Sequence, residues 1–289
     1  MSDQTQASAQ ILNCAGRLID LSVPHVMGVL NVTPDSFSDG GQYNASLDDA
    51  LRRAEIMVAE GASFIDVGGE STRPGAAAVS EAEELARVVP VVDALAREFD
   101  VVVSVDSSKP RVMIESVGAG AGLLNDVRAL LEPGALSAVA RLAVPVCLMH
   151  MQGQPSTMQK APQYRSVLEE VLAFLHSRIE ACETAGITRS RIIVDPGFGF
   201  GKSPEHNLTL LNCLDEFQQL GLPILAGLSR KSLLGQITGR PVAERLIASV
   251  AAATLAVYRG ARIIRAHDVA ATMDAVKVAH ATIRETLDE

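Results

Sequence analysis

The chain has few aromatic residues and no tryptophan: phenylalanine and tyrosine make up only 3% of its 289 residues. Its core must therefore be built from aliphatic side chains, and a hydrophobic content of 48% supplies enough of them for a folded globular protein. Buried parallel strands are typically aliphatic in this way. The composition favours an α/β protein and excludes a disordered chain.

Cysteine is also scarce. The four present are Cys14, Cys147, Cys182 and Cys213. No two of them form a C-x-x-C pair, which argues against a zinc ribbon and against a redox motif. Because they are scattered and mostly lie in apolar stretches, we expect reduced thiols, as in cytosolic proteins.

Segments for export or membrane insertion are lacking as well. Residues 1–10 are polar and have no apolar region of a secretory signal, so we expect a disordered tail on a cytoplasmic protein. The longest apolar stretch, residues 246–258, is too short to cross a bilayer. The net charge of −9 repels nucleic acid and anionic lipid, so neither is an expected partner. An anionic substrate must therefore be held by local cations.

Eight short apolar or β-branched runs recur along the chain, each of the length of a buried parallel strand. They occupy residues 26–30, 63–68, 101–105, 122–126, 144–149, 191–195, 224–229 and 261–266. Helical patterns separate them, so the sequence predicts a single-domain (β/α)8 TIM barrel over residues 11–289. A doubly wound open sheet is the alternative, but the turn NVTPDSFSDGG after the first strand lacks the G-x-G-x-x-G of such folds. Residues 11–23 are predicted to form a hairpin that closes the barrel floor.

Capping residues and prolines mark the helix starts. Ser46 is predicted to begin the first helix, and Ser80 with Glu83 forms a capping box before the second. Helices are also predicted over residues 164–185 and 268–287. Four prolines fit the first turn of a helix, where a missing N–H costs nothing: Pro110, Pro133, Pro204 and Pro241.

The carboxyl ends of the predicted strands carry polar residues. These are Asn31, residues 70–75, Asp106, Asn125, Asp126, His150, Asp195, residues 229–232, Arg265 and His267. In a barrel these ends converge on one face, where the active sites of such folds lie. Cations and histidine suit a phosphate ester, whereas buried carboxylates beside amides suit a flat heterocycle with N–H donors. Neither a Ser/His/Asp order nor an H-E-x-x-H motif supports a hydrolytic triad or a zinc protease.

One glycine-rich stretch ends like a phosphate-binding loop. Residues 195–203 read DPGFGFGKS, but Pro196 stands where G-x-x-x-x-G-K-S requires its first glycine. The spacing therefore argues against a nucleotide-binding loop of this type.

Taken together, these segments resemble the dihydropteroate synthase family. The matching motifs are NVTPDSFSDGG (31–41), GGESTRPG (68–75), VDSSKP (105–110), NDVR (125–128), LMHMQG (148–153), DPGFGFGK (195–202), LSRKS (228–232) and RAHDV (265–269). They follow the family's order and span almost the whole chain. The resemblance implies condensation of 6-hydroxymethyl-7,8-dihydropterin diphosphate with p-aminobenzoate to give 7,8-dihydropteroate and diphosphate in folate biosynthesis. It also implies the barrel fold, Mg2+, a homodimer and a target of sulfonamides.

The resemblance implies roles for individual residues. Those expected to bind the pterin are Asp106, Asn125, Asp195, Lys231 and Met149. Those expected to hold the diphosphate are Thr72, Arg73, Arg265 and His267, with Asn31 as the ligand of Mg2+. The p-aminobenzoate pocket would be shaped by Pro74, Phe200 and Ser232. The implied catalytic residues are Lys231, Arg73 and Asp35, whereas His150 is expected to be structural.

Such a site needs no strong base. The CH2–O bond of the pterin ester can break first, because the electron-rich ring stabilises the resulting cation, and a neutral aryl amine is already nucleophilic. The site must then stabilise the departing diphosphate with cations and metal. Loops 32–44 and 70–79 lack an apolar period, and we expect them to be mobile and to exclude water by folding over the site.

Two alternatives are open. A pterin-binding methyltransferase barrel uses a related set of Asp and Asn residues but has no need of the diphosphate group formed by Arg265, His267 and residues 228–232. A catalytically inactive barrel subunit is expected to have lost one of the residues needed for the reaction. Those residues, all present here, are Asn31, Arg73, Lys231 and Arg265.

Two further expectations concern assembly and the division of the site. The helix predicted over residues 242–258 is rich in small apolar residues that permit close approach, so we place part of it, together with a neighbouring helix, at a two-fold dimer interface. We also expect Asp195 to face the pterin and Arg265 the leaving group, in separate compartments. On that view Arg265→Ala leaves binding of a bare pterin nearly unaffected.

Overall fold

Eight parallel strands form a ring in the computed structural model, which describes residues 11–33, 43–71, 79–153, 158 and 162–286. In the order in which they pair, they are β8 (Ile192–Asp195), β7 (Val146–Met149), β6 (Leu123–Asp126), β5 (Val102–Asp106), β4 (Phe64–Gly68), β3 (His25–Asn31), β10 (Ile263–Ala266) and β9 (Leu225–Ala226). A parallel bridge between Val194 and Ile224 joins the two ends of this order, so the sheet closes on itself. The predicted barrel is therefore confirmed.

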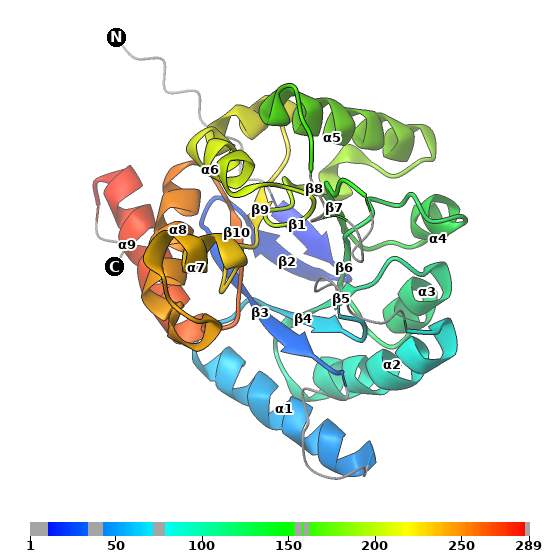
Figure 1. Cartoon of the computed structure of the whole chain (residues 1–289). Helices are drawn as coiled ribbons and strands as arrows, with labels where there is room; N and C mark the ends of the chain where they lie inside the picture. The colour runs from blue at the N-terminus through cyan, green and yellow to red at the C-terminus, as the bar shows by residue number, and fades with distance from the viewer. Residues whose placement is uncertain (1–10, 34–42, 72–78, 154–157, 159–161, 287–289) are drawn as a thin grey trace.

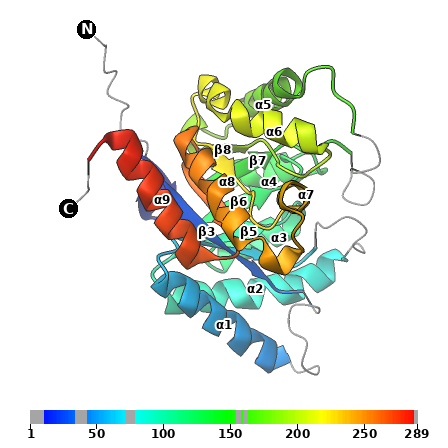
Figure 2. The same cartoon turned by 60° about the vertical axis from the view of Figure 1, so that its left-hand side comes forward.

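Helices surround the ring of strands (Figure 1). They are α1 (Tyr43–Ala59), α2 (Glu81–Glu98), α3 (Pro110–Gly118), α4 (Ala135–Arg141), α5 (Val167–Thr184), α6 (Pro204–Asn212), α7 (Ser232–Thr238), α8 (Leu246–Tyr258) and α9 (Val269–Arg284). The last two pack side by side along one flank of the barrel (Figure 2). Each helix covers the outer side of the strands with aliphatic residues.

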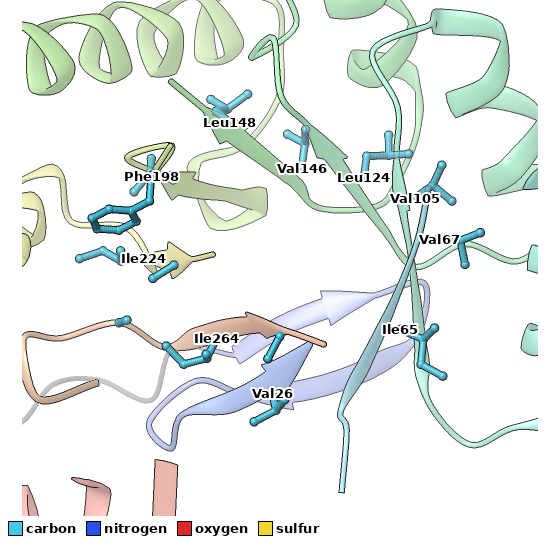
Figure 3. Packing of buried hydrophobic residues seen from close by; sticks show 14 of the residues in the cluster. Val26, Ile65, Val67, Val105, Leu124, Val146, Leu148, Phe198, Ile224 and Ile264 are labelled. Atoms are coloured by element: carbon cyan, nitrogen blue, oxygen red, sulfur yellow. The ribbon is translucent and has the colours of Figure 1, made fainter. Parts of the chain in front are cut away.

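Side chains along each strand alternate between the outside and the inside of the ring, because successive Cβ atoms point to opposite faces. On β4, Ile65 and Val67 lie on the outer side in the cluster shared with the helices, as Figure 3 shows. Phe64, their neighbour on the same strand, belongs to a separate inner cluster. The barrel is thus a packed core, with a side-chain layer on both faces of its sheet.

The floor of the barrel is closed by an antiparallel hairpin of β1 (Ile11–Cys14) and β2 (Arg17–Asp20). Leu12, Cys14 and Leu21 pack in the inner cluster against the first inward residues of the strands. Those strand residues are Met27, Phe64, Val102, Leu123, Cys147, Ile193, Leu225 and Ile263. The predicted floor hairpin is confirmed, whereas the predicted tail, residues 1–10, lies outside the described part of the chain.

On five of the eight strands, namely β4, β5, β6, β8 and β10, the inward position two residues further along is polar. Phe64 is followed by Asp66 on β4, and the inward series on β5 runs from Val102 through Ser104 to Asp106. On the other strands the corresponding polar residues are Asn125 on β6, Asp195 on β8 and Arg265 on β10. Since a strand rises roughly 3.3 Å per residue, the polar layer lies only about 7 Å above the apolar floor.

The predicted helix starts are confirmed at Ser80, Pro110 and Pro204 and are wrong at Ser46, Pro133 and Pro241. Ser80 caps α2, with its side chain accepting from Glu83 N and the Glu83 carboxylate accepting from Ser80 N. The first helix begins at Tyr43, before Ser46. Pro110 and Pro204 stand at first helical positions as predicted. Pro133 and Pro241 do not: α4 begins two residues after the former, behind the left-handed cap Gly134, and the latter precedes a 3-10 turn.

All four cysteines are free thiols, and three of them are buried. No helix in the described part of the chain is long and apolar enough to span a membrane.

Candidate active site

The polar layer opens at the mouth of the barrel, where the carboxyl ends of the strands meet. The register of the sheet sets Asn31 beside Gly68, Gly68 beside Asp106, and Asp106 beside Asn125. Across the ring, Met149 pairs with Asp195. Parallel strands bring residues from all these ends to one face, as the predicted barrel required.

Three hydrogen-bond acceptors in this layer share one arrangement: one atom of each is held by the protein and one oxygen is left open. Oδ2 of Asp106 accepts from Arg265 Nη2 at 3.0 Å, and Oδ1 of Asp195 accepts from Gly197 N at 2.7 Å. Nδ2 of Asn125 donates to Asp66 Oδ2 at 3.0 Å. No described residue donates to the remaining oxygen of Asp106, Asp195 or Asn125. Side-chain atoms of the described chain that are both fully enclosed and without a hydrogen-bond partner do not include any of these three oxygens. All three oxygens are therefore available to a ligand.

Burial makes the two carboxylates easier to protonate. It raises the pKa of Asp106 to about 7, against the charge of Arg265, which lowers it, and with Asp66 adding to the rise. Burial likewise raises the pKa of Asp195 to about 6, opposed by the hydrogen bond from Gly197 and by Lys231. Such shifts are typical of functional sites, where polar groups are kept from water until a ligand pairs with them.

The turn after Asp195 depends on glycine. Gly197 has a φ of +73°, and a Cβ there would lie 1.9 Å from the carbonyl oxygen of His150. Only glycine tolerates this conformation and this close approach. The turn places the Gly197 N–H against Asp195, so the local sequence fixes which oxygen of the carboxylate is held.

Arg265 is held between two carboxylates. Its Nε donates to Asp66 Oδ2 at 2.6 Å, and its Nη2 donates to Asp106. Burial opposes the charge, but Asp66 and Asp106 outweigh it and raise the pKa of Arg265. Nη1 has no acceptor among the described residues, so the arginine can still donate to an anionic ligand.

Lys231 brings a second cation into the mouth. Its Nζ lies 4.1 Å from the centre of the Phe200 ring, a cation–π contact, and its stem packs against Gly199. Burial, together with the charge of Arg265, lowers the pKa of Lys231 to about 8. The predicted pterin residue Lys231 and the predicted p-aminobenzoate residue Phe200 are thus in direct contact.

The loops after β9 and β10 are fastened to each other. Ser229 Oγ lies 3.0 Å from His267 Nδ1 and accepts from the His267 backbone N–H. Arg230, in a left-handed conformation with φ +58°, forms a paired ion bridge to Asp268. Burial and the nearby arginines lower the pKa of His267 to about 4, so the ring is neutral near pH 7 and its Nε2 is left for a ligand.

Other predicted site residues are placed less centrally or are not described. Met149 is buried at an inward position of β7, and Ser232 is exposed at the first position of α7. Four predicted residues lie outside the described part of the chain: Asp35, Thr72, Arg73 and Pro74.

Lys202 does not serve as a phosphate-binding lysine. Its buried Nζ donates to the carbonyl oxygens of Gly197 at 2.8 Å and Phe200 at 3.0 Å, and lies 2.9 Å from His150 Nδ1. Burial lowers its pKa to about 7 and that of His150 to about 3. His150 also packs edge-on against Phe174. This pair holds the shape of the loop, which supports the structural interpretation of His150 and the exclusion of a nucleotide-binding loop.

A divalent cation would find one protein ligand at Asn31. An ideal Cβ on Gly68 would lie 3.7 Å from Asn31 Oδ1 and 3.9 Å from Asp106 Oδ2, so these two oxygens face the same space. The described residues contain no cluster of three or more His, Cys, Asp or Glu side chains that could hold a metal by themselves. Mg2+ fits such a site, because it keeps several waters and commonly shares phosphate oxygens with its substrate.

Asp66 is a residue of the site that was not predicted from the sequence. This carboxylate is fully buried and contacts both Asn125 and Arg265, yet it lies within β4 and not at its end. The alternation from Phe64 to Asp66 to Gly68 along one face is the signal that could have revealed it.

Comparison with known proteins agrees with this geometry. Residues 27–267 match the family of pterin-binding enzymes. The dihydropteroate synthase of Haemophilus influenzae is 58% identical over 266 residues, which cover 92% of this chain and 96% of that protein. The structure of the Yersinia pestis dihydropteroate synthase in complex with a sulfonamide drug superposes with a TM-score of 0.91 at 54% identity, covering 95% of this chain and 99% of that one. The Xanthomonas albilineans enzyme in complex with 7,8-dihydropteroate gives a TM-score of 0.85 at 46% identity, covering 95% and 98%.

The mouth of this barrel combines open acceptors with half-buried cations, and its strands match this family throughout. The protein is therefore a pterin-binding enzyme. Within that class, the chain belongs to the dihydropteroate synthase family. The methyltransferase and inactive-subunit alternatives gain no support from these relatives, which are named as synthases over nearly their full length.

Proposed function

We propose that the residues at the barrel mouth carry out the dihydropteroate synthase reaction. The amine nitrogen of p-aminobenzoate forms a bond to the methylene carbon of 6-hydroxymethyl-7,8-dihydropterin diphosphate. The C–O bond to the diphosphate breaks, and the amine loses one proton. The products are 7,8-dihydropteroate, for folate synthesis, and diphosphate. The observation that supports this assignment most strongly is the set of open oxygens on Asp106, Asn125 and Asp195.

The pterin is recognised through its N–H edge. Three acceptors with one free oxygen each match a flat heterocycle that presents several N–H donors in one plane. Lys231 donates to a ring acceptor on another side, and Met149 packs against the ring. Burial removes water from the carboxylates and so raises the pKa values of Asp106 and Asp195. Hydrogen bonds from the N–H groups of the ligand would compensate for this lost water.

Cations at the same mouth stabilise the leaving group. Arg265 donates from its remaining nitrogen, and His267 contributes Nε2, while Thr72 and Arg73 are proposed to add further contacts. Burial and the nearby arginines lower the pKa of His267. A diphosphate bearing several negative charges would raise that pKa and favour protonation of the ring. These groups act on charge that develops as the C–O bond breaks, which is where electrostatic stabilisation accelerates a reaction.

Mg2+ is the proposed cofactor. Asn31 would hold it through its side-chain oxygen, with diphosphate oxygens and water as the remaining ligands. When bound, the ion would neutralise charge on the diphosphate. The residues of the chain do the remaining work of binding and orienting the pterin and keeping water away from the methylene carbon.

The second substrate is proposed to bind beside Phe200 and Ser232, with Pro74 as a third wall. Phe200 is already fixed by its contact with Lys231 and by the bond from Lys202 to its carbonyl oxygen. The aryl amine can therefore approach the pterin methylene along a surface that is formed before it binds. Lys231, Arg73 and Asp35 are proposed as the residues closest to the reacting atoms.

Diphosphate release tests this function directly. The enzyme with Mg2+ and pterin diphosphate should release diphosphate much faster when p-aminobenzoate is added, and 7,8-dihydropteroate should appear in equal amount. Release that does not respond to p-aminobenzoate would contradict a synthase. Methyl transfer from a folate to a corrinoid would support the methyltransferase alternative instead.

The chain is also proposed to work as a homodimer of one pterin-binding domain, residues 11–289, in the cytoplasm. Large apolar side chains are exposed on the adjoining helices α7 and α8, and among them Ile247 is 81% exposed and Tyr258 60%. Ala252, Ala253 and Ala256 face the chain's own barrel. The larger residues, more than the small ones, therefore support an interface on this flank.

A further inference from the structure

We propose that Asp66 is a positioning residue of the pterin pocket, which fixes the Asn125 amide with its oxygen toward the ligand and holds the Arg265 guanidinium in place. The inference rests on the proposed function, because it concerns how the pterin residues of that site are set.

Asp66 acts through its neighbours and not on the substrate. Its side chain is 0% exposed, so no ligand can reach it. All of the hydrogen bonds that its side chain accepts come from inward residues of three other strands. Oδ1 accepts from Ser104 Oγ on β5 at 2.6 Å, and Oδ2 accepts from Asn125 Nδ2 on β6 at 3.0 Å and from Arg265 Nε on β10 at 2.6 Å.

The contact with Arg265 determines which way the neighbouring amide is turned. Arginine Nε can only donate a hydrogen bond, so the Asp66 Oδ2 that it contacts acts as an acceptor. The atom of Asn125 that faces Asp66 must therefore be the donor Nδ2. A planar amide then has its oxygen on the other side, where it is open to the mouth.

This orientation gives the pocket its selectivity. With Oδ1 outward, Asn125 adds a third acceptor to those of Asp106 and Asp195, and the three match N–H donors. With the amide reversed, Asn125 would present a donor to a donor in a dry pocket. Asp66 therefore fixes the Asn125 amide so that its acceptor oxygen faces the ligand, although Asp66 itself touches no substrate.

The same carboxylate also restrains Arg265. Nε is held by Asp66 and Nη2 by Asp106, so two of the three guanidinium nitrogens are fixed and only Nη1 has no acceptor among the described residues. Loss of Asp66 would free the arginine to pair with Asp106 alone and to move within the site.

Two substitutions of Asp66 that differ in their acceptor test the proposal. Asp66→Leu removes the oxygen that faces Asn125 Nδ2 and Arg265 Nε, so it should weaken binding of a bare pterin about tenfold or more in calorimetric titration and raise KM for the pterin diphosphate. Asp66→Asn can keep one oxygen at that place while its Nδ2 donates to Ser104 Oγ, so it should bind the pterin within about threefold of the unaltered enzyme. Rescue by the variant that keeps the acceptor is not expected from a role in folding alone.

Asp126→Asn is the matched control. Asp126 is also fully buried, on β6 next to Asn125, but its bonds go to Ser108 and to the backbone of residues 128 and 130. Its loss should lower stability in urea unfolding without changing the dissociation constant for pterin. If Asp66→Leu does not fold, the side-chain amide protons of Asn125 are followed by NMR in the unaltered protein. They should exchange slowly with solvent in the absence of pterin because Asp66 holds them, and fast exchange would contradict the proposal.

Two results would overturn the proposal: unchanged pterin affinity in Asp66→Leu, or equal losses of pterin affinity in Asp66→Leu and Asp66→Asn. Diphosphate release by the unaltered enzyme is measured in the same series. Its absence would reject the synthase function, whereas the titrations of bare pterin test Asp66 independently of turnover.

Discussion

Arg265 donates from Nη2 to Asp106 Oδ2 at 3.0 Å, so a residue expected to hold the diphosphate is bonded to one expected to hold the pterin. The sequence led us to expect two separate compartments. The bond argues against this separation, because a change in Arg265 must reach the pterin through Asp106. The two substrate halves are recognised by one connected group of charges.

The first prediction replaces the expectation that Arg265 affects only the diphosphate. Arg265→Met removes the charge that lowers the pKa of Asp106, so that pKa should rise above about 7 and Asp106 should be protonated at neutral pH. Bare pterin should then bind roughly tenfold more weakly or worse at pH 7, and should recover part of this loss at pH 8.5. Calorimetric titration measures both. Arg262→Met, just before the same strand at the floor, should change neither value. Unaltered pterin affinity in Arg265→Met would restore the two-compartment view.

The second prediction concerns the donor edge of the pterin. Asp195→Asn keeps the size of the side chain. In one of the two orientations of the amide, its NH2 group faces a donor of the ligand, and in both orientations the charge-assisted hydrogen bond is lost. Such a mismatch costs on the order of 2–4 kcal/mol. Bare pterin should therefore bind about 30-fold more weakly or worse, since about 1.4 kcal/mol corresponds to tenfold. A loss of less than about threefold in titration would remove Asp195 from the pterin contacts.

The third prediction is the pH dependence of kcat/KM for the pterin diphosphate. Asp195 and Asp106 have pKa values raised to about 6 and about 7, so their carboxylate forms are lost as the pH falls through that range. Lys231 has a pKa lowered to about 8, so its ammonium form is lost as the pH rises through 8. The profile should be a narrow bell with its maximum between about 7 and 8.

Lys231→Arg separates the alkaline limb from the acid limb. Arginine stays charged well above pH 8, so the variant should lose the fall on the alkaline side while keeping the acid one, even if its maximum is lower. An alkaline limb at the same pH in both proteins would assign that titration to another group.

The fourth prediction concerns metal. Asn31→Ala removes the only protein oxygen proposed to ligate Mg2+, so the concentration of Mg2+ needed for half-maximal activity should rise. Binding of bare pterin without metal should stay unchanged, because Asn31 is not proposed to touch the ring. Activity titrations with Mg2+ measure the first effect. The same half-maximal concentration in both proteins would exclude Asn31 from the metal site.

The fifth prediction concerns assembly. The protein should have twice its chain mass of 30.5 kDa in light scattering at micromolar concentration. Ile247→Glu places a charge on the 81% exposed residue of α8 and should shift the mass to that of one chain. Ile56→Glu, at a 56% exposed position on α1, should leave the dimer intact. A single-chain mass for the unaltered protein would contradict the proposed interface.

Much of the architecture could be predicted from the sequence because the signals were local. The strand runs and the Ser80–Glu83 box depend on neighbouring residues only. All eight strands lie at the predicted runs, although β9 covers only two of the six residues predicted for it, and the capping box appears as predicted. The start of α1 could not be predicted in this way, since Ser46 satisfies the same local rule as Ser80 yet lies inside the helix. Tertiary packing decides between such sites, and a single chain segment does not carry that information.

The site was predictable at its rim and not in its interior. Residues at strand ends, such as Asn125, Asp195 and Arg265, are visible because barrel sites lie there. Asp66 is part of the same network but lies in the middle of a strand, and its role depends on bonds to residues 38, 59 and 199 positions away. The anchoring of Asp106 by Arg265 and of Asn125 by Asp66 likewise depends on contacts between strands, which the sequence does not state.

The bridge from Val194 to Ile224 is the only described pairing that closes the ring between β8 and β9, and β9 itself has just two residues. Backbone amides along this seam have fewer partners than those of the longer pairings, so they should exchange with deuterated solvent sooner than the amides of β4 or β5. The seam also runs between Asp195, at the end of β8, and Lys231, beyond β9. A brief opening there would widen the mouth between these two residues while the rest of the sheet stays paired. We therefore expect the barrel to open locally between β8 and β9 without unfolding elsewhere.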